Sequence, residues 1–143
     1  MRERLGLAPH PEGGYYRRVF ESAALVQPDD GRPPRRALTT IYYLLPAGQR
    51  SQWHRVASDE AWCWLEGAEL ELRVSTEGAT GPSEAGTDVR LGPVGDGVAP
   101  VHVVPGNSWQ SARTLGSYTL VACAVGPGFD FEDFTLLDDL PGQ

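Results

Sequence analysis

Glycine and proline recur so often along this chain that no long regular element can run uninterrupted. The sequence has 17 glycines and 12 prolines among 143 residues. Both residues break regular structure, because proline removes a backbone donor and glycine adds conformational freedom. Helical periodicity is weak between these breaks, whereas short runs rich in Val, Ile, Thr and aromatic residues recur. The chain is therefore predicted to be built from short strands.

Nine runs are predicted to be strands, and no internal repeat or linker divides them. Gly67 lies between two of the runs and predicts a tight hairpin there. The segments 26–36 and 76–86 are predicted loops. Residues 1–143 are thus expected to form a single all-β domain, a sandwich or a closed barrel. The predicted strands are 15–22, 37–45, 51–56, 60–66, 69–75, 87–92, 100–105, 108–113 and 117–125.

Composition excludes several classes of function. The net charge is −7, which argues against nucleic acid as a partner. All 12 basic residues are arginines, so Schiff-base chemistry on a lysine is excluded. Cys63 and Cys123 are isolated and are predicted to be buried free thiols. The N-terminus has no apolar core of the length found in signal peptides, and no apolar stretch approaches the length of a membrane span. We therefore expect a cytoplasmic protein without membrane contact.

The stretch "GQRSQWHRVASDEAWCWLEG", residues 48–67, contains the strongest candidates for a site. Side chains alternate between the two faces of a strand, so residues of the same parity as His54 are predicted to share its face. If the strands on either side of the "ASD" turn run antiparallel, His54 and Glu60 meet on one interior face. Such a pocket has apolar walls and few polar groups, as small-molecule sites do. The predicted pocket residues are Arg50, Gln52, His54, Glu60, Trp62 and Trp64.

The spacing in this stretch resembles the first motif of the cupin superfamily, G-x5-H-x-H-x3-E-x6-G. Val56 stands where that motif has its second histidine. The second cupin motif has a histidine after a proline, and in "PGNSWQ" its place is taken by Gln110. The matching positions of the first motif are Gly48, His54, Glu60 and Gly67.

The donors left for a metal ion are few. A carboxamide is a poor ligand for zinc or iron, and valine is none. We therefore expect no tightly bound metal cofactor. If a divalent metal binds weakly, its candidate ligands are His54, Glu60 and Gln110.

The resemblance extends over nearly the whole chain. "APHPEGGYYRRVFES", "IYYLLPAGQRSQWHRVASDEAW", "VPGNSWQSAR" and "GPGFDFEDF" occur in the order found in one small cupin family of unknown function. The resemblance implies a double-stranded β-helix, the jelly-roll barrel, and usually a homodimer. It does not imply a particular reaction.

Residues outside the central stretch allow two interpretations. In "PHPEGG", His10 is interpreted as part of a turn that begins the first strand, whereas Glu12 fits either that turn or the pocket and is kept as a candidate ligand-binding residue. Arg50 has the best position among the arginines to bind a carboxylate or phosphate. The aromatic residues of "GFDFEDF" are expected to pack against the barrel or a dimer partner.

Three functions are compatible with these residues. The first is a metal-independent epimerase- or isomerase-type enzyme acting on a small polar metabolite, sugar-like or carboxylated. His54 would abstract or relay a proton, Glu60 would orient it or act as the acid, and Gln110 would hydrogen-bond the substrate. The second is a non-catalytic ligand-binding or sensing protein. The third is a weak metallo-cupin.

Overall fold

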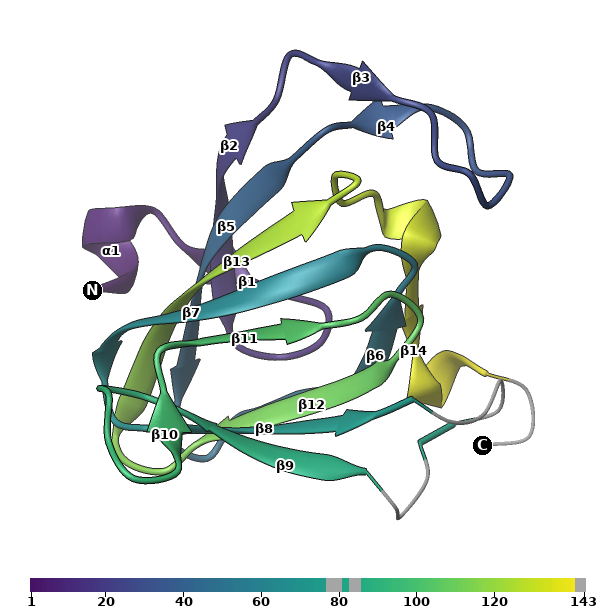
Figure 1. The fold of residues 1–143 in the computed structure, drawn as a ribbon. Coiled ribbons are helices and arrows are strands. Elements are labelled where there is room, and N and C mark those ends of the chain that lie inside the picture. The colour runs from purple at the N-terminus through teal and green to yellow at the C-terminus, as the bar shows by residue number, and fades with distance from the viewer. Residues whose placement is uncertain (77–80, 83–85, 141–143) are drawn as a thin grey trace.

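The computed structural model describes residues 1–76, 81–82 and 86–140. Within these residues the strands form two six-stranded sheets, which pack face to face (Figure 1), and one two-stranded sheet. The order is β1-β2-β5-β13-β7-β11 in the first sheet and β10-β9-β8-β12-β6-β14 in the second, while β3 and β4 pair separately. The architecture is the all-β arrangement predicted from the sequence.

The elements have the following bounds. The first sheet contains β1 (Ala8–Pro9), β2 (Tyr15–Glu21), β5 (Thr39–Pro46), β7 (Asp59–Gly67), β11 (Val101–Val104) and β13 (Tyr118–Gly126). The second contains β6 (Arg50–Val56), β8 (Leu70–Ser75), β9 (Thr87–Leu91), β10 (Val98–Ala99), β12 (Trp109–Thr114) and β14 (Phe134–Leu136). The remaining elements are α1 (Arg2–Leu5), β3 (Leu25–Val26), β4 (Arg35–Arg36), η1 (Phe131–Asp133) and η2 (Leu137–Asp139).

Each of the nine predicted strands is present, displaced by at most two residues at either end. The predicted loop 26–36 is correct in its middle, but its two ends pair as β3 and β4. Most of the predicted loop 76–86 lies outside the described residues. None of the helices among the residues that the structure describes is long and apolar enough to cross a bilayer.

The predicted hairpin at Gly67 is wrong. β7 pairs with β11 and β13, whereas β8 pairs with β9 and β12, so the chain passes at Gly67 from the first sheet to the second. Gly67 has a φ of 95°, and a Cβ there would lie 2.5 Å from the carbonyl oxygen of Tyr118. The glycine is required by a sharp crossing between sheets, which local sequence does not distinguish from a hairpin.

The hydrophobic core lies between the two sheets. Tyr43 and Trp62 from the first sheet pack edge to face, with ring centroids 6.0 Å apart. Leu70 and Leu72 of β8 meet them from the second sheet and are fully buried. Inward-facing residues alternate with outward-facing ones along each strand, which is why both sheets can contribute to one core.

The turn that precedes β2 carries Glu12 into the interior. The His10 N–H donates to the Gly14 carbonyl at 2.9 Å, and the Gln52 N–H donates to the Glu12 carbonyl at 2.7 Å, which links the turn to β6. Gly13 has a φ of 106°, and a Cβ at this position would lie 2.2 Å from the Arg50 carbonyl oxygen. Only glycine therefore fits this close approach of two backbones.

Gly13→Ala is expected to lower the free energy of unfolding by about 3 kcal/mol, because it combines a strained φ with a backbone overlap. Gly48→Ala is the matched control, since Gly48 has a φ of 81° but open space around its Cβ position. The control should cost only about 1 kcal/mol, from the strained φ alone. Urea denaturation measures both variants, and equal losses would contradict the steric account of Gly13.

Candidate functional site

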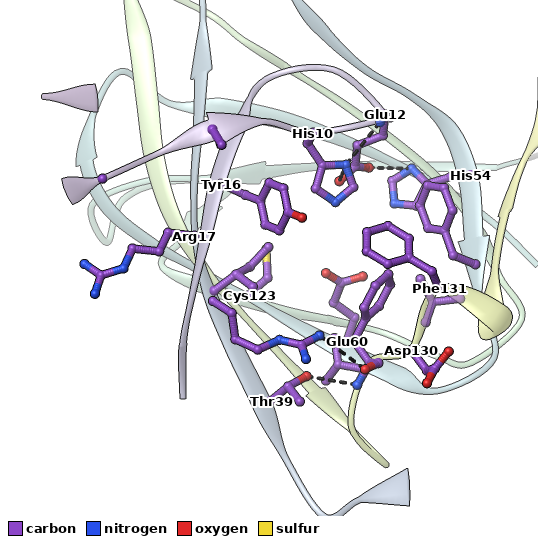
Figure 2. A pocket seen from close by; sticks show the side chains of 18 residues that line it. His10, Glu12, Tyr16, Arg17, Thr39, His54, Glu60, Cys123, Asp130 and Phe131 are labelled. Atoms are coloured by element: carbon purple, nitrogen blue, oxygen red, sulfur yellow. Dashed lines mark hydrogen bonds and ion pairs between the residues drawn. The ribbon is translucent and has the colours of Figure 1, made fainter. Parts of the chain in front are cut away.

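A cavity of about 580 Å³ opens at one end of the barrel. Its walls come from β2, β5, β7 and β13 of the first sheet, from β6 of the second, and from the terminal segments on either side (Figure 2). His54 and Val56 enter it from β6, and Glu60 enters from β7 in the opposite sheet. The predicted convergence of His54 and Glu60 therefore occurs, but across the barrel and not within one antiparallel pair of strands.

Glu12 and His54 form a buried carboxylate–imidazole pair. Glu12 Oε2 lies 2.8 Å from His54 Nδ1 and accepts a hydrogen bond from Ser51 Oγ at 2.6 Å. His54 Nδ1 also lies 2.7 Å from the carbonyl oxygen of Gln52. Both neighbours of Nδ1 are acceptors, so Nδ1 carries a proton in every charge state of the ring. His54 Nε2 is the nitrogen that remains for a ligand, and in Figure 2 it faces the cavity.

Glu60 is held by a chain of hydrogen bonds. Trp62 Nε1 donates to Gln110 Oε1 at 2.7 Å, and Gln110 Nε2 donates to Glu60 Oε1 at 2.9 Å. Because the indole nitrogen can only donate, the amide oxygen of Gln110 must face Trp62 and its NH₂ group must face Glu60. All three side chains are buried. The chain fixes the position of the Glu60 carboxylate at the cavity wall.

The buried charges shift one another's pKa values. Burial alone would lower the pKa of His54, but the Glu12 carboxylate outweighs it and raises the pKa to about 8. Burial would raise the pKa of Glu12, yet His54, His10 and Ser51 hold it below its usual value. Burial, with the nearby negative charge of Glu12, raises the pKa of Glu60 to about 7. Two groups that titrate near neutrality thus face the same cavity.

His10 is a second histidine in the cavity. Its side chain is buried and lies edge-on to the ring of Tyr16, with ring centroids 4.6 Å apart. Burial lowers the pKa of His10 below the usual value for histidine. The interpretation of His10 as a turn residue is incomplete, because the same turn that begins β2 also places its ring in the cavity wall.

The C-terminal segment forms the opposite wall. It leaves β13, crosses the open end of the barrel and adds β14 beside β6 (Figure 1). Phe129, Phe131 and Phe134 line the cavity, and the Phe134 ring stacks on His54 with centroids 5.4 Å apart. The expected packing of the aromatic residues against the barrel is therefore correct, and it also makes them part of the site.

Two arginines hold this segment in place through Asp133. Arg35 makes a bidentate contact to the Asp133 carboxylate, at 3.0 Å from Nε and 2.9 Å from Nη2. Arg32 Nη1 adds a third contact at 2.9 Å and also donates to Ser58 Oγ at 2.9 Å. The Asp133 side chain is only 3% exposed. The β3–β4 connection is thereby attached to the residues that carry the aromatic wall.

Some residues predicted for the pocket lie elsewhere. Arg50 and Gln52 are exposed and do not line the cavity, because β6 contains a β-bulge. Between the pairs Gln110–His54 and Ala112–Ser51, β12 advances two residues while β6 advances three. The extra residue reverses the alternation, so Ser51 is buried and Gln52 is exposed. The prediction that Arg50 and Gln52 share the face of His54 is wrong for this reason.

The tryptophans and Gln110 lie behind the cavity and not in its wall. Trp62 belongs to the hydrophobic core, and Trp64, half-buried against that core, donates to the Ala68 carbonyl at 3.1 Å. The side chain of Gln110 contacts the site through Glu60, and its backbone pairs with His54 in the β12–β6 ladder. Trp62 and Trp64 do have the inward parity that was predicted, but Tyr16 and the C-terminal phenylalanines line the cavity in their place.

The donors at this site do not fit a metal ion. The side-chain oxygen of Gln110 is occupied by Trp62, and its NH₂ group, which faces Glu60, cannot be a ligand. Val56, at the second histidine position, lines the cavity with an apolar side chain. Among the residues that the structure describes, no group of three or more His, Cys, Asp and Glu side chains is placed to hold a metal ion. His54 and Glu60 alone would be a weak set.

Cys123 adds a thiol to the cavity. It is free and buried, and it hydrogen-bonds the Glu60 carboxylate. Burial raises its pKa well above the usual value, so it stays a neutral donor. Cys63 is also free, as predicted, but the prediction that it is buried is wrong, because its side chain lies on the other face of the first sheet and is only half-buried.

Comparison with known proteins gives a family and several similar structures. The family model described as "Cupin superfamily (DUF985)" matches residues 2–137. A hypothetical protein from Leishmania major is 35% identical with a TM-score of 0.85, over 94% of this chain and 83% of that one. A protein from Shewanella oneidensis is 33% identical with a TM-score of 0.82, over 94% and 80%. Comparison with curated proteins gives no match.

A more distant similarity concerns the fold alone. Oxalate decarboxylase from Bacillus subtilis is 14% identical with a TM-score of 0.62, and the similarity covers 92% of this chain and 30% of the decarboxylase. At this identity the comparison supports a shared barrel architecture and nothing about chemistry.

Proposed function

The chain belongs to the DUF985 family of the cupin superfamily, and we propose that its barrel cavity binds a small polar metabolite and moves a proton on it without a metal ion. The observation that carries the proposal is the pair His54 and Glu60. They enter one cavity from opposite sheets, and their pKa values of about 8 and about 7 lie close to neutrality. Distant cupin structures include enzymes, among them a DMSP lyase and oxalate decarboxylases.

The two groups can act as one base and one acid. Between their pKa values Glu60 is ionised and His54 is protonated. Glu60 can then take a proton from a carbon of the ligand, while His54 Nε2–H can return one from the other side. Return from the opposite side inverts the carbon, which is an epimerisation. Return to a neighbouring atom is an isomerisation.

The positioning groups suit this role. Glu12 orients the His54 ring and stabilises its positive charge, as a carboxylate does for a catalytic imidazole. Gln110 and Cys123 orient the Glu60 carboxylate. The aromatic residues line one side of the cavity, and burial of His54, Glu12 and Glu60 strengthens the interactions between their charges.

The surroundings favour a ligand that is sugar-like or carboxylated. Arg18 lines the cavity and donates to the Phe129 carbonyl at 3.2 Å, which places its guanidinium beside the C-terminal wall. A guanidinium in this position can bind a carboxylate or phosphate group of the ligand. Arg17 does not take this role, since its guanidinium points away from the cavity in Figure 2.

Incubation of the protein in D₂O with a panel of sugars, sugar phosphates and hydroxy or keto acids tests the proposal. Proton NMR then detects any carbon-bound hydrogen that exchanges with solvent. We expect at least one compound to exchange, and Glu60→Gln to suppress the exchange. If a compound binds in the cavity but keeps its hydrogen and is recovered unchanged, the protein is a binding or sensing module and the proposal fails.

The rate of exchange is expected to follow a bell-shaped pH profile with its maximum between about 7 and about 8. Below this range Glu60 takes up a proton and can no longer act as the base, and above it His54 loses the proton that it donates. The initial exchange rate at saturating ligand, measured from pH 5 to 10, checks the profile. A rate that rises monotonically with pH would contradict it.

A further inference from the structure

We propose that His10 is a third catalytic residue, which donates a hydrogen bond from Nε2–H to a carbonyl oxygen of the ligand. The substrate class is then a compound whose exchanging C–H lies next to an aldehyde or ketone carbonyl, such as a keto sugar or a 2-keto acid. This inference rests on the proposed proton transfer and names the kind of molecule on which it acts.

The hydrogen bond to Nδ1 identifies which nitrogen of His10 carries the proton. The backbone N–H of Glu12 donates to His10 Nδ1 at 3.1 Å. A backbone N–H can only donate, so Nδ1 must present its lone pair. A neutral ring then carries its hydrogen on Nε2, the reverse of the arrangement in His54.

The neighbouring carboxylate does not reverse this assignment. Glu12 Oε1 lies 3.5 Å from His10 Nδ1, which is longer than a hydrogen bond, whereas the Glu12 N–H is within bonding distance. The Glu12 carboxylate instead bonds His54 and Ser51 through Oε2. Glu12 thus serves both histidines, with its backbone to one and its side chain to the other.

Packing fixes the ring of His10 in this orientation. Beyond Tyr16, three aromatic rings surround it at centroid distances of 5.9 to 6.2 Å, namely Tyr43, Phe131 and Phe134. Figure 2 shows His10, His54 and Glu60 around one space, with the second ring nitrogen of His10 directed into it. The cavity therefore presents a neutral donor beside the base and the acid.

A carbonyl next to the reacting carbon gives this donor a function. When Glu60 takes the proton, the electron pair of the C–H bond forms a C=C bond, and the π electrons of the carbonyl move to its oxygen. The resulting enolate oxygen accepts the hydrogen bond from His10 Nε2–H, which keeps its proton. His54 then returns a proton to carbon and the C=O bond re-forms. Glu60 afterwards releases its proton to solvent and His54 takes one from solvent, so the cycle closes without an oxidant or reductant. A preorganised donor at such an oxygen contributes about 10²–10³-fold to the rate.

Long-range ¹H–¹⁵N NMR of the imidazole rings tests the first part of the inference without a substrate. The chain has three histidines, so His102→Gln and His10→Gln suffice to assign the signals. At pH 7 we expect His10 to be neutral with its hydrogen on Nε2, and His54 to carry a hydrogen on Nδ1. A His10 ring protonated on Nδ1, alone or as imidazolium, would overturn the inference while leaving the proposed proton transfer intact.

Exchange kinetics on the panel of compounds test the second part. We expect exchange only in compounds with an aldehyde or ketone carbonyl, with kcat lower by about 10²–10³-fold in His10→Ala and partly restored in His10→Gln, whose amide can donate. Exchange confined to compounds that lack such a carbonyl, or an unchanged kcat in His10→Ala, would overturn the role of His10. Absence of exchange in every compound would instead overturn the proposed function on which it rests.

Discussion

A His54→Gln protein is expected to exchange ligand hydrogen with solvent about 10²–10⁴-fold more slowly than the wild type. Glutamine can hydrogen-bond but cannot hold or release a proton near neutral pH. The imidazole of His54 has a pKa of about 8 and directs its Nε2 into the cavity, so near neutral pH it can donate a proton to a ligand there. The D₂O exchange assay measures the effect directly.

The control for this substitution is His102→Gln, since His102 lies half-buried on β11 outside the cavity. It should leave the rate unchanged. Because His54→Gln leaves the buried Glu12 carboxylate without its partner, the single variant is also expected to lose stability. The double variant Glu12→Gln/His54→Gln removes both charges and tests catalysis in a folded protein. A double variant that is folded and exchanges at the wild-type rate would show that His54 has no part in proton transfer.

Asp133→Ala is expected to lower the free energy of unfolding by about 3 kcal/mol, because it leaves two guanidinium groups without their shared carboxylate. Arg35 is buried and would retain two distant partners, the exposed Glu132 carboxylate and the Pro34 carbonyl oxygen, each 3.5 Å away. Urea denaturation at pH 7 measures the loss. Hydrogen exchange at β14 should report the same change locally, since Asp133 directly precedes that strand.

The pH dependence of the stability lost in Asp133→Ala can also be predicted. Burial alone would raise the pKa of Asp133, but the hydrogen bonds from Arg35 and Arg32 hold it below its usual value. A lowered folded-state pKa stabilises the protein above the unfolded value of about 4, and this contribution is lost as the pH falls through the folded-state pKa. The difference in free energy of unfolding between the wild type and Asp133→Ala should therefore become smaller as the pH falls below about 4.

Asp88→Ala is the matched control, because Asp88 pairs with Arg73 on the surface and its side chain is 58% exposed. An exposed pair contributes at most about 1 kcal/mol. Equal losses in the two variants would contradict the view that the contacts of Asp133 hold the cavity wall in place.

The strands and the two central site residues could be predicted because they depend on local pattern. Runs of β-branched and aromatic residues between glycines and prolines marked all nine long strands. Alternation placed Glu60 and Trp62 on the inner face of β7, and the motif spacing placed His54 and Val56 on that of β6. Val56 and Gln110, at the positions of two motif histidines, predicted a poor metal site, and this stays a prediction; in the structure the Gln110 side chain bonds Trp62 and Glu60.

The wall of the cavity could not be predicted, since it depends on contacts between distant parts of the chain. The bulge that turns Arg50 and Gln52 outward arises from the register of β6 against β12, more than 50 residues later. Phe134 stacks on His54 and Phe131 lies beside His10, in a segment that Asp133 attaches to arginines about 100 residues earlier. A signal was present in "PHPEGG", where two rigid prolines and two glycines around His10 and Glu12 indicate a turn of unusual shape.

The central claim is that the protein moves a proton on its ligand without a metal ion. It is tested most directly by measuring hydrogen exchange between ligand and solvent with protein that has been freed of metal ions. The protein is purified without metal-affinity steps, treated with a chelator, analysed for metal content by mass spectrometry, and assayed in D₂O with a compound that the wild type exchanges. Proton transfer by His54 and Glu60 predicts an unchanged exchange rate at negligible metal content. Loss of exchange on chelation, with recovery after a divalent cation is added back, would contradict it.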